Sequence, residues 1–262
     1  MRTVIFIPAR YASSRYPGKP LAELRQKDGS TKSLIRMSWE AARAIEGVDA
    51  VYVATDDARI AEHARGFGAE VIMTSEACEN GTARCAEAAA QLGEAPDLVV
   101  NFQGDAPLTP PWFVEGLIAA MKADASVQMA TPVLRCDRQT YENFTEDRRN
   151  GRVGGTTAVF DRHMNALYFS KEVLPYIAPG KLPEPIPVFH HVGVYAYRPG
   201  ALKAYIETPV SELETLEGLE QLRFLSAGLA VRCVEVEARG RLFWELNNPE
   251  DVARIEAALE AS

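Results

Sequence analysis

The sequence predicts an α/β protein with a doubly wound, mainly parallel mixed sheet and an inserted antiparallel sub-region. Two observations support this prediction. In residues 1–133, short β-branched runs alternate with segments of helical periodicity, which is the pattern of right-handed βαβ units. After Pro132, longer strand-like runs and a proline-rich stretch at 176–188 replace this alternation, which indicates mixed or antiparallel strands.

The alternation places each element in order. Strands are predicted at 4–9, 51–55, 70–74, 97–102 and 127–133, with helices between them at about 33–45, 57–66, 81–92 and 110–123. The remainder predicts strands within 154–169, 189–198 and 231–237, and helices at about 200–207 and 213–226. A last helix is expected after Pro249, because proline suits a first helical position. No linker interrupts the chain, so a single domain over 1–262 is expected.

Composition and charge restrict the class of protein. The 262 residues are 47% apolar and 24% charged, as in soluble globular proteins. The net charge of −8 argues against a protein that coats nucleic acid or an anionic membrane, and no apolar run approaches the roughly 20 residues of a membrane span. Without a signal peptide or a C-x-x-C motif, the four cysteines predict free thiols and a cytoplasmic location.

Three cations follow the first predicted strand of this acidic chain. The stretch IPARYASSRYPGKP (7–20) contains Arg10, Arg15 and Lys19, and ligands of open α/β sheets collect at the carboxyl ends of the strands. Cations so close together repel one another unless an anion joins them, which favours a phosphate site. The spacing is not that of a P-loop, and a solvated basic loop is the alternative.

Two further loops carry candidate ligands. In NFQGDAP (101–107), Gln103 and Asp105 follow a buried-looking strand, and a lone carboxylate beside phosphates is typical of a Mg²⁺ site; an ordinary turn aspartate is the alternative. In NGTARCAEA (80–88), Thr82 and Arg84 open a helix whose N-terminus can receive an anion, although Thr82 could equally be a plain N-cap. Together these loops favour a nucleoside triphosphate bound with Mg²⁺.

Other polar and aromatic residues are interpreted as structural. The acidic run ELETLEGLE (212–220) is expected to be mostly a solvated helix face. The tryptophans Trp39, Trp112 and Trp244 are expected in the core or at its rim. Adjacent strand residues point to opposite faces, so one of His190 and His191 is expected to face the site.

At this point the sequence resembles a known family. The motifs IPARYASSRYPGKPL, VYVATDD, NGTAR, NFQGDAPL, ALYFSK, HHVGVYAYR and LEQLRFL occur in the order and at about the spacing of the 3-deoxy-manno-octulosonate (Kdo) cytidylyltransferases, over nearly the whole chain. The resemblance implies a homodimeric, Mg²⁺-dependent enzyme of lipopolysaccharide biosynthesis with the nucleotidyltransferase version of the doubly wound fold. In the implied reaction, the anomeric hydroxyl of a 2-keto-3-deoxy sugar acid attacks the α-phosphorus of CTP and releases pyrophosphate.

The resemblance also implies roles for individual residues. Residues 1–133 would be mainly the nucleotide-binding half, and 134–262 the sugar-binding and dimerisation half. Arg10, Lys19 and Asp105 would act in catalysis. The implied binding residues are Ala9, Arg10, Ser14, Arg15, Lys19, Thr82, Arg84 and Gln103 for the nucleotide, Lys171, His191, Tyr195, Glu220 and Gln221 for the sugar, and Asp105 with Asn247 for the metal.

Three positions depart from the family pattern. Asn247 replaces an aspartate that is a second metal ligand in the family pattern, with Glu245 a candidate to compensate. Lys171 replaces an arginine, which keeps the charge but loses bidentate geometry, and Thr157 replaces a lysine. Because all three lie on the sugar and metal side, cytidylyl transfer is predicted more firmly than Kdo itself. Other ulosonic acids, a non-sugar acid or phosphonate acceptor, and a catalytically weakened CTP-binding protein remain alternatives.

Overall fold

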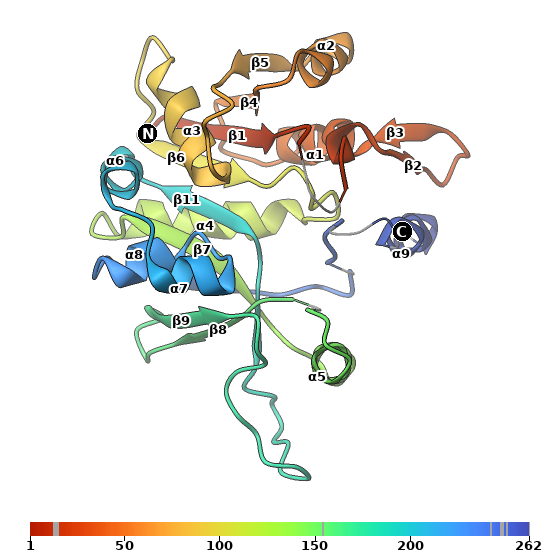
Figure 1. Ribbon diagram of the computed structural model, residues 1–262, viewed down its shortest axis with the longest axis vertical. Coiled ribbons are helices and arrows are strands. Elements are labelled where there is room, and N and C mark those ends of the chain that lie inside the picture. The colour runs from red at the N-terminus through yellow and green to blue at the C-terminus, as the bar shows by residue number, and fades with distance from the viewer. Residues whose placement is uncertain (13–15, 154, 242, 247–248, 250, 262) are drawn as a thin grey trace.

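A computed structural model of the protein describes residues 1–12, 16–153, 155–241, 243–246, 249 and 251–261. These residues form a ten-stranded mixed sheet and a separate two-stranded hairpin (Figure 1). The strand order is β5 (Glu70–Met73), β4 (Ala50–Thr55), β1 (Thr3–Ala9), β6 (Leu98–Phe102), β11 (Val194–Tyr197), β7 (Met129–Arg135), β10 (Phe189–His191), β8 (Thr157–Phe160) and β9 (Ala166–Ser170), with β12 (Arg232–Val236) paired to β7. The predicted mixed α/β sheet is confirmed.

Strand β11 joins the two halves of the chain. Strands β5, β4, β1 and β6 are parallel to one another, whereas β11 lies antiparallel between β6 and β7. β1 and β6 are almost wholly buried, as expected for strands covered by helices on both faces. A segment from the second half therefore lies directly beside the loops that follow the parallel strands.

Helices cover both faces of the sheet. On one face, the core contains side chains from α1 (Leu34–Arg43), α2 (Ala58–Gly66) and α4 (Pro111–Ala123). On the other face it contains side chains from α3 (Gly81–Ala90), α6 (Pro199–Glu207) and α8 (Leu222–Ser226), with α7 (Glu212–Glu217) beside α8. Figure 1 shows α5 (Arg138–Arg149) and α9 (Asp251–Ala261) farther out, away from these layers.

Several predicted boundaries differ from the structure. The helix predicted at 213–226 is two helices, because α7 ends at Glu217 and Gly218, with a left-handed φ of 62°, caps it. The runs 154–169 and 189–198 each contain two short strands. The final helix begins at Asp251, which agrees with the prediction of a helix after Pro249, although Pro249 is not its first residue.

Two elements were not predicted at all. Helix α5 buries only Phe144 among its twelve residues, so its sequence shows little apolar periodicity. The hairpin of β2 (Glu23–Arg25) and β3 (Thr31–Ser33) has strands of three residues, which are too short to show a clear alternation. A single 3₁₀ turn, Lys19–Leu21, follows β1.

The remaining structural expectations can be compared directly. Trp39 and Trp112 pack at the margin of the larger core, and Trp244 packs against a smaller cluster near α9, as predicted. All four cysteines are unpaired, which confirms the prediction of free thiols. No helix of the described residues combines the length and the apolar composition that a membrane span requires.

Candidate active site

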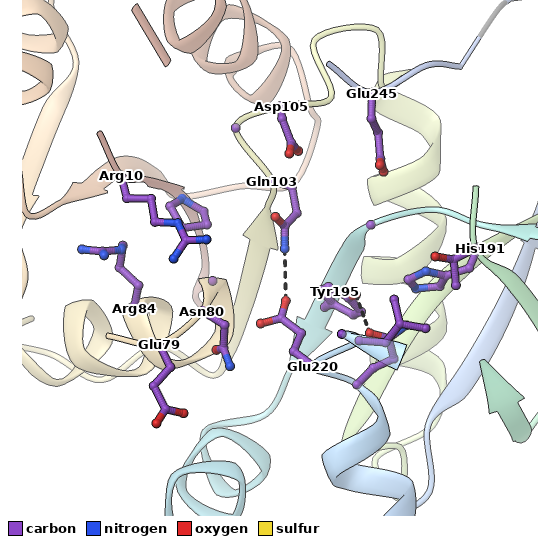
Figure 2. A pocket seen from close by; sticks show the side chains of 18 of the residues that line it. Arg10, Glu79, Asn80, Arg84, Gln103, Asp105, His191, Tyr195, Glu220 and Glu245 are labelled. Carbon is purple, nitrogen blue, oxygen red and sulfur yellow. Dashed lines mark hydrogen bonds between the residues drawn. The ribbon is translucent and has the colours of Figure 1, made fainter. Parts of the chain in front are cut away.

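A cavity of about 850 Å³ lies where the parallel strands end. Its walls come from the segments after β1 and β6, the start of α3, the β10–β11 connection and the α7–α8 loop. Figure 2 shows Arg10 and Arg84 on one side, His191 and Tyr195 on the opposite side, and Asp105 between them. The topology therefore joins both halves of the chain around one cavity, at the edge where open α/β sheets bind ligands.

Of the cations after β1, Lys19 lies beside Asp105 and Arg10 lines the same cavity. The Lys19 ammonium is 2.7 Å from Asp105 Oδ2 and donates to the Leu246 carbonyl oxygen at 3.0 Å. Arg10 is exposed and lines the same cavity. The Gly18 amide donates to the Tyr11 carbonyl at 2.9 Å and closes the loop, with Gly18 in a left-handed conformation that suits glycine. Ser14 and Arg15 lie outside the described residues.

The start of α3 differs from the prediction in one respect. Asn80 is the N-cap, because its side chain accepts from the Ala83 amide at 2.9 Å. The Thr82 hydroxyl is instead buried and lies 2.7 Å from the Tyr197 hydroxyl, so an N-cap role for Thr82 is wrong. Arg84 lines the cavity but is only 3% exposed, and it pairs with Asp56 at 2.8 Å. Its charge is therefore already compensated, whereas Arg10 forms no ion pair with a carboxylate of the described residues.

Glu220 connects the two sides of the cavity. One carboxylate oxygen accepts from the Thr82 amide at 3.0 Å, and the other accepts from the Gln103 side chain at 3.1 Å (Figure 2). Burial raises the pKa of Glu220 above its ordinary value. Gly81 permits this close approach, since a Cβ there would lie 3.1 Å from Gln103 Nε2. Residues predicted for the nucleotide and for the sugar thus meet at one carboxylate.

A second polar network lines the opposite wall. The Tyr195 hydroxyl donates to Gln221 Oε1 at 3.1 Å, and His191 Nε2 lies 2.9 Å from the Thr131 hydroxyl. Burial lowers the pKa of His191 to about 3, so its imidazole is neutral at pH 7. Gln221 lines the cavity, is 1% exposed, and its Nε2 has no hydrogen-bond partner among the described residues. This wall therefore offers an unused amide donor to a polar ligand.

Lys171 adds a positive charge to that wall. It is half-buried at the cavity, and no ion pair links its ammonium to a described carboxylate. Its backbone amide donates to Glu217 Oε2 at 2.9 Å, which holds the residue at the end of β9. The Thr157 hydroxyl, by contrast, is buried and donates to the Glu172 carbonyl at 2.6 Å. Thr157 therefore has a structural contact and does not line the cavity.

One structural interpretation is corrected at this site, and a second has one clear exception. Both His190 and His191 line the cavity, not one of them, because β10 ends at its wall. The acidic run 212–220 is exposed at five of its nine positions, as predicted, but Glu214 is buried and accepts from Arg223 at 2.7 Å. Glu217 accepts from the Ser170 hydroxyl at 2.6 Å. The buried ion pair was missed because a charge run on a helix carries no signal of burial.

The metal-side residues are partly described. Asn247 lies outside the described residues. Glu245 lines the cavity, and Figure 2 shows its side chain and that of Asp105 both directed into it. The Leu246 amide donates to the Asp105 carbonyl at 2.8 Å, which holds the two segments side by side.

Comparisons with known proteins agree with this geometry. The cytidylyltransferase family model matches residues 4–232. The chain is 41% identical to the 3-deoxy-manno-octulosonate cytidylyltransferase of Maricaulis maris (strain MCS10), over 100% of this chain and 98% of that protein. It is 38% identical to the Arabidopsis thaliana protein named 3-deoxy-manno-octulosonate cytidylyltransferase, mitochondrial, over 98% and 83% of the two chains.

Solved structures show the same relationship. CMP:2-keto-3-deoxy-manno-octonic acid synthetase complexed with CTP superposes with a TM-score of 0.84 at 32% identity, covering 100% of this chain and 99% of that one. The 4-diphosphocytidyl-2C-methyl-D-erythritol synthase of Anaerococcus prevotii DSM 20548 has a TM-score of 0.60 at 12% identity, covering 99% and 96% of the two chains, and shows a shared fold alone. With the cavity, the full-length identity and the family model in agreement, the chain belongs to the 3-deoxy-manno-octulosonate cytidylyltransferase family.

Proposed function

We propose that the protein transfers CMP from CTP to the anomeric hydroxyl of 3-deoxy-manno-octulosonate and releases pyrophosphate. The observation that supports this most directly is one cavity lined by Arg10, by Lys171 and by Asp105 with its partner Lys19. Figure 2 shows Asp105 between Arg10 and the wall that carries His191 and Tyr195. A triphosphate and a sugar carboxylate both need cations, and the reacting atoms must meet between them. The enzyme acts as a CTP-dependent nucleotidyltransferase.

The nucleotide side neutralises charge. Arg10 and Lys19 would contact the phosphates, and Gln103 with the start of α3 would lie at the cytidine. In the reaction, an oxygen–phosphorus bond forms between the acceptor hydroxyl and the α-phosphorus, the bond to the β-phosphate oxygen breaks, and the hydroxyl proton is lost. Such a transfer needs in-line positioning and charge stabilisation more than a protein nucleophile.

A divalent cation fits beside Asp105. The Lys19 ammonium there already lies between two oxygen atoms, the Asp105 carboxylate and the Leu246 carbonyl, and oxygen ligands are those that Mg²⁺ prefers. Asp105 would hold the ion, with Asn247 and Glu245 as candidates for a second ligand. When bound, such an ion neutralises phosphate charge and lowers the pKa of a nearby hydroxyl.

The acceptor side would hold the sugar acid. Lys171 would pair with the carboxylate. The Gln221 Nε2 group, which has no hydrogen-bond partner among the described residues, would donate to a sugar oxygen. Tyr195 and the neutral His191 would complete the wall. Glu220 would fix the position of this wall relative to the nucleotide through its hydrogen bonds to Gln103 and Thr82.

The test is pyrophosphate release with CTP, Mg²⁺ and a panel of ulosonic acids, followed by the mass of the product. We expect a CMP adduct of Kdo. An adduct of another acid only would overturn the acceptor assignment, and silence across the panel from folded protein that still binds CTP in calorimetry would favour a weakened binding protein. The variant Arg10→Met should raise the KM for CTP more than the KM for the acid.

We further propose a homodimeric, cytoplasmic protein with a single domain. The single domain is supported by β11 lying between β6 and β7. The homodimer is supported by four exposed apolar side chains on the α6–α7 segment, which are Ile206, Val210, Leu213 and Leu216. Light scattering after gel filtration measures the mass, and a monomer at micromolar concentration would refute the dimer.

A further inference from the structure

The Lys19–Asp105 ion pair involves two groups with separate tasks in the proposed reaction. Lys19 is assigned to the phosphates and Asp105 to the divalent cation, yet the two are bonded to each other at 2.7 Å. Both side chains are largely buried, at 17% and 23% exposure, so solvent screens the pair less than it screens a surface pair.

The ammonium also contacts the C-terminal segment. Lys19 Nζ donates to the Leu246 carbonyl at 3.0 Å, and the Leu246 amide donates to the Asp105 carbonyl at 2.8 Å. The lysine charge is thus held among oxygen atoms of Asp105 and Leu246, where a metal would need the same oxygen atoms. An ammonium and a metal ion that contact the same carboxylate repel each other, because like charges so close interact strongly.

We propose that Lys19 holds the cation position of the empty enzyme, so that nucleotide and divalent cation bind cooperatively by exchanging partners at Asp105. This inference depends on the proposed function. A metal alone must displace Lys19, which then has no anion. A nucleotide alone draws Lys19 to its phosphates and leaves Asp105 as an unpaired carboxylate near them. With both present, each group has a partner, and linkage makes the coupling reciprocal.

The first test measures Mn²⁺ binding without nucleotide, by the electron paramagnetic resonance signal of free Mn²⁺. The variant Lys19→Met removes the competing ammonium and should bind Mn²⁺ about tenfold more tightly than the wild type, within the usual range of such couplings. Arg10→Met is the matched control, since it removes a cation of the same cavity that forms no ion pair with a described carboxylate. Its Mn²⁺ affinity should stay within about twofold of the wild type.

Two results of this titration would overturn the exchange. Either Lys19→Met binds Mn²⁺ no more tightly than the wild type, or Arg10→Met shows the same gain, which would make the effect one of general charge. Circular dichroism of each variant establishes that it is folded.

The second test measures CTP binding in EDTA by calorimetry. Asp105→Asn should bind metal-free CTP more tightly, because Lys19 becomes available and a repelling charge is lost. In a Lys19→Met background the same substitution removes only the repulsion, so the gain should be smaller. An equal gain in both backgrounds would refute the exchange. Both tests measure binding, whereas pyrophosphate release tests the proposed activity separately. If the enzyme releases pyrophosphate but these titrations show no exchange of partners at Asp105, this inference is rejected and the proposed function stands.

Discussion

The buried Arg223–Glu214 ion pair makes a sharp prediction about stability. Arg223 is 5% exposed and Glu214 8% exposed, and two guanidinium nitrogens donate to the two carboxylate oxygens at 2.7 Å each. Glu214 lies in α7 and Arg223 lies in α8, on either side of the loop that carries Glu220 and Gln221. The pair therefore holds the acceptor wall of the cavity in place.

The substitution Arg223→Met keeps a side chain of similar length but removes both hydrogen bonds to Glu214 and a longer one to Glu79 Oε2 at 3.3 Å. It also removes the contact of the guanidinium with the Tyr205 ring, 4.2 Å from its centroid. Because the change leaves a buried carboxylate without its partner, we expect the free energy of unfolding to fall by about 3–5 kcal/mol. The exposed pair of Lys203 and Glu207, at 76% and 66% exposure, is the matched control, and Lys203→Met should cost less than about 1 kcal/mol.

Urea unfolding followed by circular dichroism measures both values. The double variant Glu214→Met with Arg223→Met should be more stable than Arg223→Met alone, because no charge then remains buried. The KM for the acceptor should rise in Arg223→Met while CTP affinity changes little. A loss below about 1 kcal/mol for Arg223→Met, or a double variant that loses the sum of the single losses, would refute this account of the pair.

Three further predictions concern pH, packing and metal binding. Burial lowers the pKa of His190 to about 4, so the unfolded chain binds a proton below its ordinary pKa of about 6.5 while the folded protein does not. Stability should fall as pH drops from about 6.5 to 4, by about 2 kcal/mol from this residue at pH 5, and unfolding of His190→Gln at several pH values should show a shallower slope. A Cβ at Gly155 would lie 2.5 Å from the Phe144 ring, whereas one at Gly116 in α4 meets only ordinary contacts at 3.9 Å. The free energy of unfolding should therefore fall by about 1–3 kcal/mol in Gly155→Ala and rise by about 0.5–1 kcal/mol in Gly116→Ala. Thermal melting that showed the reverse order would contradict this packing. Asn247→Asp should tighten Mn²⁺ binding in the presence of CTP, because a carboxylate replaces a neutral amide, and an unchanged titration would exclude that residue as a ligand.

Much of the fold follows from local patterns in the first half of the chain. The strand at 4–9 is a continuous apolar run, and the strand at 97–102 is apolar except for Asp97 and Asn101. Their burial in β1 and β6 follows because helices cover both faces. Helix α5 and the β2–β3 hairpin were missed. A twelve-residue helix with one buried phenylalanine, or two strands of three residues, gives too weak a periodic signal. The break between α7 and α8 depends on Gly218 adopting a left-handed conformation.

The sequence by itself determined the α/β class, the cationic loop after the first strand and the carboxylate after a buried strand, because these are properties of neighbouring residues. The tertiary structure alone decided that Lys19 pairs with Asp105, that Thr82 bonds to Tyr197 and not to its own helix, and that Glu214 is buried against Arg223. Those contacts join residues that are distant in the chain or separated by a turn. Local sequence patterns do not reveal which of these residues come together in space. The physical reason is the insertion of β11 between β6 and β7, which brings the second half of the chain against the loops of the first.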